Sequence, residues 1–226
     1  MKKYGVFDIL GPIMIGPSSS HTAGAVRLGI MARAIATPNF NKVECLLHGS
    51  FGSTYKGHGT DRALAAGLLG MKPSDIRLRD SLKIAEERGL NIIFTKADLG
   101  DAHPNTVKFI IYKNNGDVLS IVGSSIGGGN IVINEIDGEK LEFTGKLPTI
   151  IIKHIDYKGV ISKAAYILYK EDINIAYLKV YRDDRGKSAY MIFETDSRIK
   201  KETIEQLQNI DKVMSVKVIN ELTEGE

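Results

Sequence analysis

The sequence predicts an α+β fold in two parts that meet near residues 145–148. Its 226 residues exceed the roughly 150 residues of a typical single domain. Glycines and four of the five histidines are concentrated before residue 146, whereas short strands and helices alternate compactly from residue 149 onward. We therefore expect one domain over residues 1–146 and a second over residues 149–222.

The helices of the first part are predicted from caps and apolar spacing. They are expected to cover residues 21–36, about 60–70, and 80–88. A hydroxyl in the run Ser18–Ser20 is a good N-cap for the first helix, which Pro38 ends. Thr60 and Asp61 are candidate caps for the second helix.

The strands of the first part are predicted from β-branched, apolar runs between turn residues. They are expected at residues 42–48, 91–95, 106–112, 118–124, 130–135 and 141–143. Asn115-Gly116 and Asp137-Gly138 are strong signals for tight hairpins. Hairpins join antiparallel strands, so this part is expected to be an α+β domain with an antiparallel sheet.

The second part has a regular order of elements. We expect a strand at 149–155, a helix at 160–170, strands at 174–182 and 188–194, a helix at 200–209 and a strand at 213–219. The segments 156–159 and 183–186 are predicted turns. This βαββαβ order is the split βαβ pattern of ferredoxin-like domains.

Composition excludes several classes of protein. Hydrophobic residues make up 43% and charged residues 25% of the chain, which is typical of a globular protein. The net charge of +3 is small and dispersed, so no nucleic-acid partner is expected. No apolar run approaches the roughly 18 residues of a membrane span, and residues 1–8 lack the apolar stretch of a signal peptide. We expect a cytoplasmic chain without a membrane partner.

Cysteine and histidine usage predicts no metal site in this chain. Cys45 is the only cysteine, so the chain alone cannot form an internal disulfide or supply the thiolates of an iron–sulfur cluster. The histidines show no HxH, HxxxH or HExxH spacing. Cys45 lies within a predicted strand and is expected to be a small buried apolar residue.

The first segment that suggests chemistry is Gly16-Pro17-Ser18-Ser19-Ser20-His21-Thr22, directly before a predicted helix. Hydroxyls and free backbone N–H groups at a helix start favour a carboxylate or phosphate. The alternative is that these residues only cap the helix, although one serine would suffice for that.

The second segment runs from His48 to Asp61 and contains glycines, hydroxyls, two histidines and a lysine. Glycines let the backbone approach a ligand closely. His58 is a candidate for proton transfer near neutral pH. Asp61 is a candidate to orient His58 or to cap the helix. The alternative is a flexible surface loop.

Two further segments are weaker candidates. His103 and Asn105 are able to hydrogen-bond a small polar ligand, but a turn leading into a strand explains them as well. Gly127, Gly128 and Gly129 suggest a bulge or a backbone nest for a carboxylate, and the alternative is a plain wide hairpin. If all four segments converge in space, they describe a pocket for a small polar molecule with a carboxylate.

Three of these motifs together resemble the β subunit of iron–sulfur-dependent L-serine dehydratase. They are the heptapeptide of residues 16–22, Gly57-His58-Gly59-Thr60-Asp61, and Ser125-Ile126-Gly127-Gly128-Gly129. Residues 1–146 are similar to the allosteric substrate-binding domain that some phosphoglycerate dehydrogenases share. Residues 149–222 look like an ACT domain, although the segment 156–159 departs from its usual Pro-Gly entry loop.

The resemblance implies that L-serine is deaminated to pyruvate and ammonia. It implies a [4Fe–4S] cluster that is held by a partner α subunit and acts as a Lewis acid on the leaving hydroxyl. His21 and His58 are then the candidate catalytic residues. The substrate-binding candidates are Ser18, Ser19, Ser20, Thr22, His103, Asn105, Gly127, Gly128 and Gly129.

Two other functions stay open at this point. The ACT-like part favours a regulatory sensor subunit that binds an amino acid and has no catalytic role. The other alternative is a plain assembly scaffold for the partner subunit. In each case the open edge of a ferredoxin-like sheet favours pairing with a second copy, so a homodimer is expected.

Overall fold

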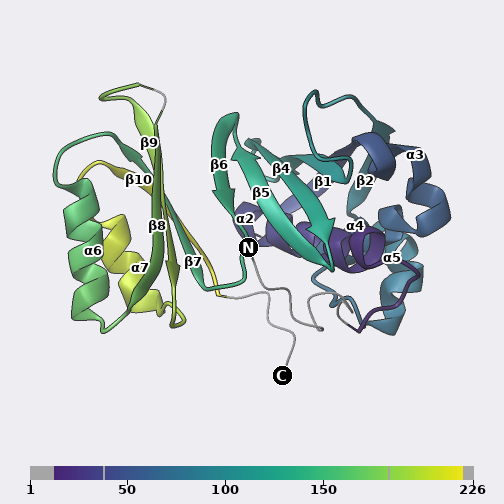
Figure 1. The fold of residues 1–226 in the computed structure, drawn as a ribbon, viewed down its shortest axis with the longest axis horizontal. Coiled ribbons are helices and arrows are strands. Elements are labelled where there is room, and N and C mark those ends of the chain that lie inside the picture. The colour runs from purple at the N-terminus through teal and green to yellow at the C-terminus, as the bar shows by residue number, and fades with distance from the viewer. Residues whose placement is uncertain (1–12, 38, 183, 221–226) are drawn as a thin grey trace, which may run out of the picture. The chain divides into compact units, whose positions relative to one another are not determined.

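A computed structural model of the protein describes residues 13–37, 39–182 and 184–220. The chain divides into two compact units, residues 1–138 and 139–226. Each unit combines helices with a mainly antiparallel sheet, so the predicted α+β class is confirmed (Figure 1). The predicted domain boundary lies slightly later than this division, and the domain ranges stay predictions.

A few predictions fall on residues outside the described part. They concern the segment 1–8, the helix stop at Pro38, one residue of the turn 183–186 and the last two residues of the range 149–222. Among the described residues, no helix is long and apolar enough to cross a membrane.

The helices predicted for the first unit are present, together with further helical segments between them. In chain order they are the π-helical turn η1 (Ser19–Gly24), α2 (Ala25–Ala36), α3 (Gly49–His58), α4 (Thr60–Leu68), the 3₁₀ turn η2 (Ile76–Asp80) and α5 (Ser81–Glu87). The first predicted helix therefore exists, but its first turn is wound as η1. Gly89 follows α5 with a φ of +71°, a conformation that suits glycine and ends a helix.

The first sheet has six strands in the order β2-β1-β3-β4-β5-β6. The strands are β1 (Phe40–Leu47), β2 (Asn91–Lys96), β3 (Thr106–Lys113), β4 (Val118–Gly127), β5 (Asn130–Ile136) and β6 (Glu139–Phe143). All six predicted strands are confirmed. The sheet is mainly antiparallel, as expected, but the pair β1–β2 is parallel. The chain passes through three helices between these strands, and such a crossover connects parallel neighbours.

Register explains how the first core is built. Cys45 pairs with Phe109, and Phe109 pairs with Ile121, so the three side chains share one face of the sheet. All three are fully buried, whereas their neighbours along each strand are less buried. The helices of the unit cover this face (Figure 1). Burial therefore alternates along these strands, as in a sheet with one face packed on the core.

Helices α2 and α4 cross at a contact between two glycines. A Cβ on Gly67 would lie 2.1 Å from the carbonyl oxygen of Val26, and one on Gly29 would lie 2.6 Å from that of Leu64. Backbones can approach this closely only where the side chain is a hydrogen atom. This crossing packs the second half of α4 directly against α2.

The glycine-rich segment after β1 is helical, so the alternative of a flexible loop is wrong. It forms α3, which ends at Gly59 with a φ of +69°. Each helical glycine costs about 1 kcal/mol relative to alanine, but a Cβ on Gly52 would lie 2.5 Å from the carbonyl oxygen of Leu47. Tertiary packing of α3 on β1 therefore requires glycine there. Thr60 and Asp61 belong to the first turn of α4 and Gly59 is its N-cap, which corrects the predicted caps.

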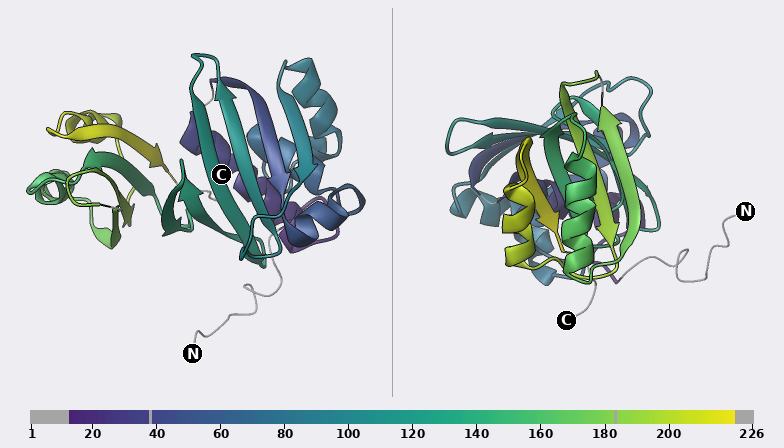
Figure 2. Two further views of the ribbon diagram at one scale, coloured as in Figure 1. Left: turned by 90° about the horizontal axis from the view of Figure 1, so that it is seen from above. Right: turned by 90° about the vertical axis from the view of Figure 1, so that its left-hand side faces the viewer.

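The second unit shows the predicted βαββαβ order. Its elements after β6 are β7 (Thr149–Ile155), α6 (Val160–Lys170), β8 (Ile175–Arg182), β9 (Ser188–Thr195), α7 (Lys201–Gln208) and β10 (Val213–Ile219). The sheet order is β10-β7-β9-β8, which is the order of a ferredoxin-like domain. Figure 2 shows α6 and α7 side by side on one face of this sheet. They bury an apolar core that includes Ile152, Leu168, Phe193 and Leu207.

Candidate active site

The serine-rich motif forms a capped helix start. Ser18 is extended, and its Oγ accepts the backbone N–H of His21 at 3.2 Å. The N–H of Thr22 donates to the Ser18 carbonyl at 2.8 Å. This confirms a capping role for one of the three serines. Ser19 and Ser20 lie within η1 itself, and His21 is buried in the same turn.

His21 is enclosed by hydroxyl groups from two segments. The residue is 8% exposed. The Oγ of Ser18 lies 3.4 Å from Nδ1, while Ser50 Oγ and Thr54 Oγ1 each lie 3.2 Å from Nε2. The ring also contacts Phe51 edge-on, with 5.2 Å between ring centroids. Burial lowers the pKa of His21, the nearby His58 lowers it further, and a hydrogen bond to the backbone of Ser50 opposes the change. His21 is therefore favoured as a neutral imidazole at pH 7.

His58 is the second histidine of this cluster. It is the last residue of α3 and is exposed. Its ring stands at 89° to the ring of His21, with 4.7 Å between centroids. The two predicted catalytic residues, 37 positions apart in the sequence, are thus neighbours. The carboxylate of Asp61 accepts the adjacent N–H of Arg62 at 2.8 Å, and among the described residues no hydrogen bond or ion pair joins it to His58. Burial raises the pKa of Asp61.

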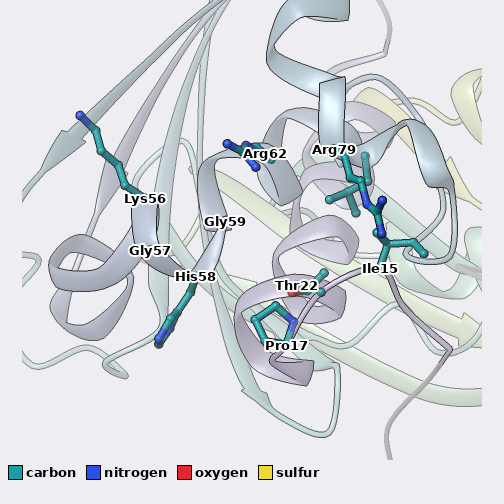
Figure 3. A pocket seen from close by; sticks show the side chains of 11 residues that line it. Ile15, Pro17, Thr22, Lys56, Gly57, His58, Gly59, Arg62 and Arg79 are labelled. Atoms are coloured by element: carbon teal, nitrogen blue, oxygen red, sulfur yellow. The ribbon is translucent and has the colours of Figure 1, made fainter.

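A pocket of about 250 Å³ opens beside His58. Its lining comes from three segments: residues 15–17 with Thr22, the junction of α3 and α4, and η2 (Figure 3). Three cationic side chains contribute to it, namely Lys56, Arg62 and Arg79, and its lining residues include no carboxylate. In Figure 3, Lys56 extends away from the other labelled side chains, whereas Arg79 lies on the opposite side of the view, next to Ile15. Such a pocket favours a small anion.

The glycine run of residues 127–129 forms the turn between β4 and β5. All three glycines have positive φ values, of 100°, 59° and 77°. Gly127 pairs with Asn130, so Gly128 and Gly129 are the two residues of a tight hairpin. Arg27 on α2 donates to the carbonyl of Gly129 at 2.6 Å. The run is therefore a hairpin, but a tight one rather than the expected wide one, and the register shifts between Ser125 and Gly127, as at a bulge. A nest for a carboxylate stays a prediction.

Ser125 connects this hairpin strand to the serine-rich turn. It is fully buried, and its Oγ donates to the carbonyl of Ser20 at 3.0 Å. A Cβ on Gly24 would lie 2.1 Å from the hydroxyl oxygen of Ser125. The absence of a side chain at Gly24 thus lets η1 lie directly against β4.

The turn of residues 103–106 borders the same cluster. The backbone N–H of Asn105 donates to Nδ1 of His103 at 3.1 Å. The carbonyl of Asn105 accepts the N–H of Ser125 at 2.9 Å. A Cβ on Gly49 would lie 2.7 Å from the carbonyl oxygen of Pro104, so the start of α3 lies on this turn. His103 itself is exposed. The four segments singled out in the sequence therefore meet in one region of the first unit.

Sequence reasoning missed Ser50 and Thr54, the two hydroxyls on Nε2 of His21. With His58 they follow the spacing i, i+4, i+8, which places all three on one face of a helix. This spacing was visible in the sequence, but the glycines of the segment argued against a helix, and without a helix the spacing does not place the three side chains on one face. Arg62 and Arg79 were also missed, because the sequence offers no sign that α4 and η2 share a pocket.

The described residues do not fit an iron–sulfur cluster. Cys45 is fully buried in β1, and burial raises the pKa of its thiol. No group of three or more His, Cys, Asp or Glu side chains within the described ranges is arranged to hold a metal ion. We therefore derive no chemical step of this chain through a cluster.

Comparison with known proteins agrees with the clustered motifs. A family profile described as serine dehydratase beta chain matches residues 5–88. The L-serine dehydratase beta chain of Peptoniphilus asaccharolyticus is 40% identical over 220 residues, 97% of this chain and 99% of that one. The probable L-serine dehydratase beta chain of Bacillus subtilis strain 168 is 42% identical over 216 residues, covering 96% and 98%.

A longer relative matches over part of its length. The L-serine dehydratase TdcG of Escherichia coli strain K12 is 29% identical over 185 residues, which cover 68% of this chain and 40% of that protein. The beta-chain relatives, by contrast, align along nearly their whole length. The protein therefore belongs to the family of L-serine dehydratase beta chains.

Proposed function

We propose that this chain forms, with an α chain, an enzyme that deaminates L-serine to pyruvate and ammonia. The observation that carries the proposal is the contact between His21 and His58 at the edge of a cationic pocket. The reaction removes the weakly acidic α-proton and the β-hydroxyl of a substrate that carries a carboxylate. It therefore needs a proton acceptor, a proton donor and a group that binds the carboxylate.

The described residues offer each of these groups. His21 is favoured as a neutral imidazole by its burial, so it suits the role of proton acceptor. His58 is exposed at the pocket and suits proton transfer to or from the substrate. Arg62 and Arg79 provide positive charge for the carboxylate.

The polar donors near this pocket complete the binding site in our proposal. Thr22 lines the pocket, and Ser18, Ser19 and Ser20 precede it in the same turn. Asn105 and the hairpin of Gly127, Gly128 and Gly129 adjoin this turn through Ser125, and His103 borders it.

We infer that the chain depends on a partner α chain, which would hold the [4Fe–4S] cluster implied by the sequence motifs. The single cysteine is buried, so the thiolates for a cluster would have to come from elsewhere. A cluster would supply Lewis acidity for the departing hydroxyl. The match to only 40% of the longer E. coli relative supports an assembly in which another chain provides the remaining part.

We also infer that residues 1–146 are an allosteric-substrate-binding-like domain and residues 149–222 an ACT domain. The strand order of the second sheet supports the ACT assignment. It also favours the second candidate function, a sensor that binds an amino acid without catalysing its reaction. The strand β8 lies at the edge of this sheet and exposes Tyr177 and Val180, which supports pairing with a second copy.

The proposal is tested by anoxic purification of the tagged chain from cells that also express its α chain. Pyruvate formation from L-serine is assayed with the complex and with each chain alone. We expect activity in the complex alone, and His58→Ala should lower kcat by roughly 100-fold or more, the usual worth of a proton-transfer group. Unchanged activity in the His58→Ala complex would contradict the role of His58, and tight serine binding without turnover would favour the sensor.

A further inference from the structure

The hydroxyl of Thr54 constrains the proton on His21. Thr54 Oγ1 donates its single proton to the carbonyl of Ser50 at 2.9 Å, one turn earlier in α3. The same oxygen lies 3.2 Å from Nε2 of His21. Because a hydroxyl has one proton, Thr54 can only accept from Nε2 in this arrangement. This arrangement favours a hydrogen on Nε2.

The surroundings of Ser50 favour the same tautomer. A hydrogen bond from the His21 ring to the backbone of Ser50 raises the pKa of His21, as donation to a carbonyl does. Ser50 Oγ lies 3.2 Å from Nε2 and, as a hydroxyl, either accepts from an N–H there or donates to a lone pair, so it is compatible with both tautomers. A bare lone pair on Nε2 would instead face Thr54 Oγ1, whose proton is directed to the Ser50 carbonyl. The neutral imidazole is therefore favoured with its hydrogen on Nε2.

The opposite nitrogen, Nδ1, then carries the lone pair. It lies 3.4 Å from Ser18 Oγ, which already accepts the backbone N–H of His21. The hydroxyl proton of Ser18 is thus available to point toward Nδ1. His21 is buried, whereas Ser18 is half-buried. Ser18 therefore links the basic nitrogen to the less buried side of the turn.

We propose that Thr54 is a positioning residue that holds His21 in the Nε2-protonated tautomer, so that Nδ1 is the basic atom and exchanges protons through Ser18. In the forward transfer, the Ser18 O–H bond breaks as its proton moves to Nδ1, and Ser18 Oγ takes one proton from the bound molecule. The imidazole gains one positive charge and the donor molecule loses one proton. The catalytic part rests on the proposed function, whereas the tautomer does not.

The tautomer is measured directly by NMR on the full chain labelled with ¹⁵N-histidine. Long-range ¹H–¹⁵N spectra distinguish a protonated from an unprotonated ring nitrogen, and spectra above pH 7 report the neutral ring. The His21→Ala variant assigns the signals. We expect Nε2 protonated and Nδ1 unprotonated in the wild type. Protonated Nδ1 in the wild type would overturn the proposal without any variant having to fold.

Matched variants test whether Thr54 causes this preference. Thr54→Val keeps the shape and removes the oxygen, so we expect a mixture of tautomers, and Thr54→Ser should restore the single form. Ser53→Ala is the control, since Ser53 Oγ makes the equivalent bond to the Gly49 carbonyl at 3.0 Å on the exposed side of α3. An unchanged single tautomer in Thr54→Val would overturn the assignment.

Kinetics of the assembled enzyme supply the second readout. Thr54→Val should lower kcat by roughly 10-fold or more with a smaller change in KM, since a misplaced proton removes the base rather than the binding groups. Thr54→Ser should restore most of the rate, and Ser53→Ala should behave as wild type. A wild-type rate in Thr54→Val with a mixed tautomer would overturn the positioning role. A wild-type rate in His21→Ala would refute the proposed function while leaving the tautomer assignment standing.

Discussion

His21 and His154 are both buried histidines, one in each unit, but their surroundings differ. His21 meets hydroxyls from the turn η1 and from helix α3, and a second histidine stands against its ring. His154 lies within β7, and its Nδ1 bonds the neighbouring Ile155 carbonyl at 2.8 Å. Its Nε2 is buried without a recorded partner among the described residues. Burial alone therefore does not mark a site. Convergence of polar groups from separate segments does.

The contrast between His21 and His154 would be wrong if the two histidines were equally important for turnover. We expect His21→Ala to lower kcat/KM of the assembled enzyme by roughly 100-fold or more, because a proton-transfer group is lost. His154→Ala should leave kcat/KM near wild type and lower the free energy of unfolding by roughly 1–3 kcal/mol, as buried truncations do. Steady-state kinetics and urea unfolding measure the two effects. A near-wild-type kcat/KM for His21→Ala would end its assignment to the active site.

The close backbone packing around His21 is the next test. Gly24→Ala would place a Cβ 2.1 Å from the buried Oγ of Ser125. We expect a loss of roughly 1–3 kcal/mol in the free energy of unfolding, as for other overpacked sites. The matched change Gly57→Ala meets nothing within 4 Å in helix α3, and should stabilise the chain by up to about 1 kcal/mol. Equal unfolding midpoints for the two variants would show that η1 does not depend on this contact.

The pocket of the first unit is lined by cationic side chains, whereas the core of the second unit is apolar, so the next prediction concerns these cations. In Arg62→Gln and Arg79→Gln, KM for L-serine should rise by roughly 5-fold, about 1 kcal/mol of lost charge interaction with the carboxylate. High salt should weaken serine binding by the wild type more than by the variants. Arg88→Gln, an exposed change beyond the pocket lining, is the control. KM values that match the control would show that the pocket does not receive the carboxylate.

The smallest expected effect is on stability at acid pH. Because burial and His58 lower the pKa of His21, the unfolded chain binds a proton more readily than the folded chain. The stability contributed by neutral His21 is complete above its unfolded pKa of about 6.5 and is lost as the pH falls from there toward the folded pKa. One group changes the slope by at most about 1.4 kcal/mol per pH unit. Urea unfolding at pH 7.5 and 5.5 should show a smaller acid loss for His21→Ala than for wild type, and equal losses would contradict this coupling.

Much of the fold could be read from local patterns. Hairpin signals such as Asn115-Gly116, alternating strands and helical spacing predicted the strands and most helices, because those features depend on neighbouring residues. The same reasoning failed at α3, where glycines lower local helix propensity but permit Gly52 to pack against Leu47. Local propensity could not reveal a contact between a helix and a strand.

For the site, the sequence by itself supplied the chemical groups: the serine-rich turn, the two histidines and the glycine hairpin. Their motif spacing was also enough to indicate the family. Only the tertiary structure decided that His21 and His58 touch, that Ser50 and Thr54 face Nε2, and that two arginines from α4 and η2 share a pocket. The physical reason is that these contacts join residues distant in the chain. Their geometry depends on backbone approaches at Gly24, Gly52 and the crossing of α2 with α4, which no local pattern encodes.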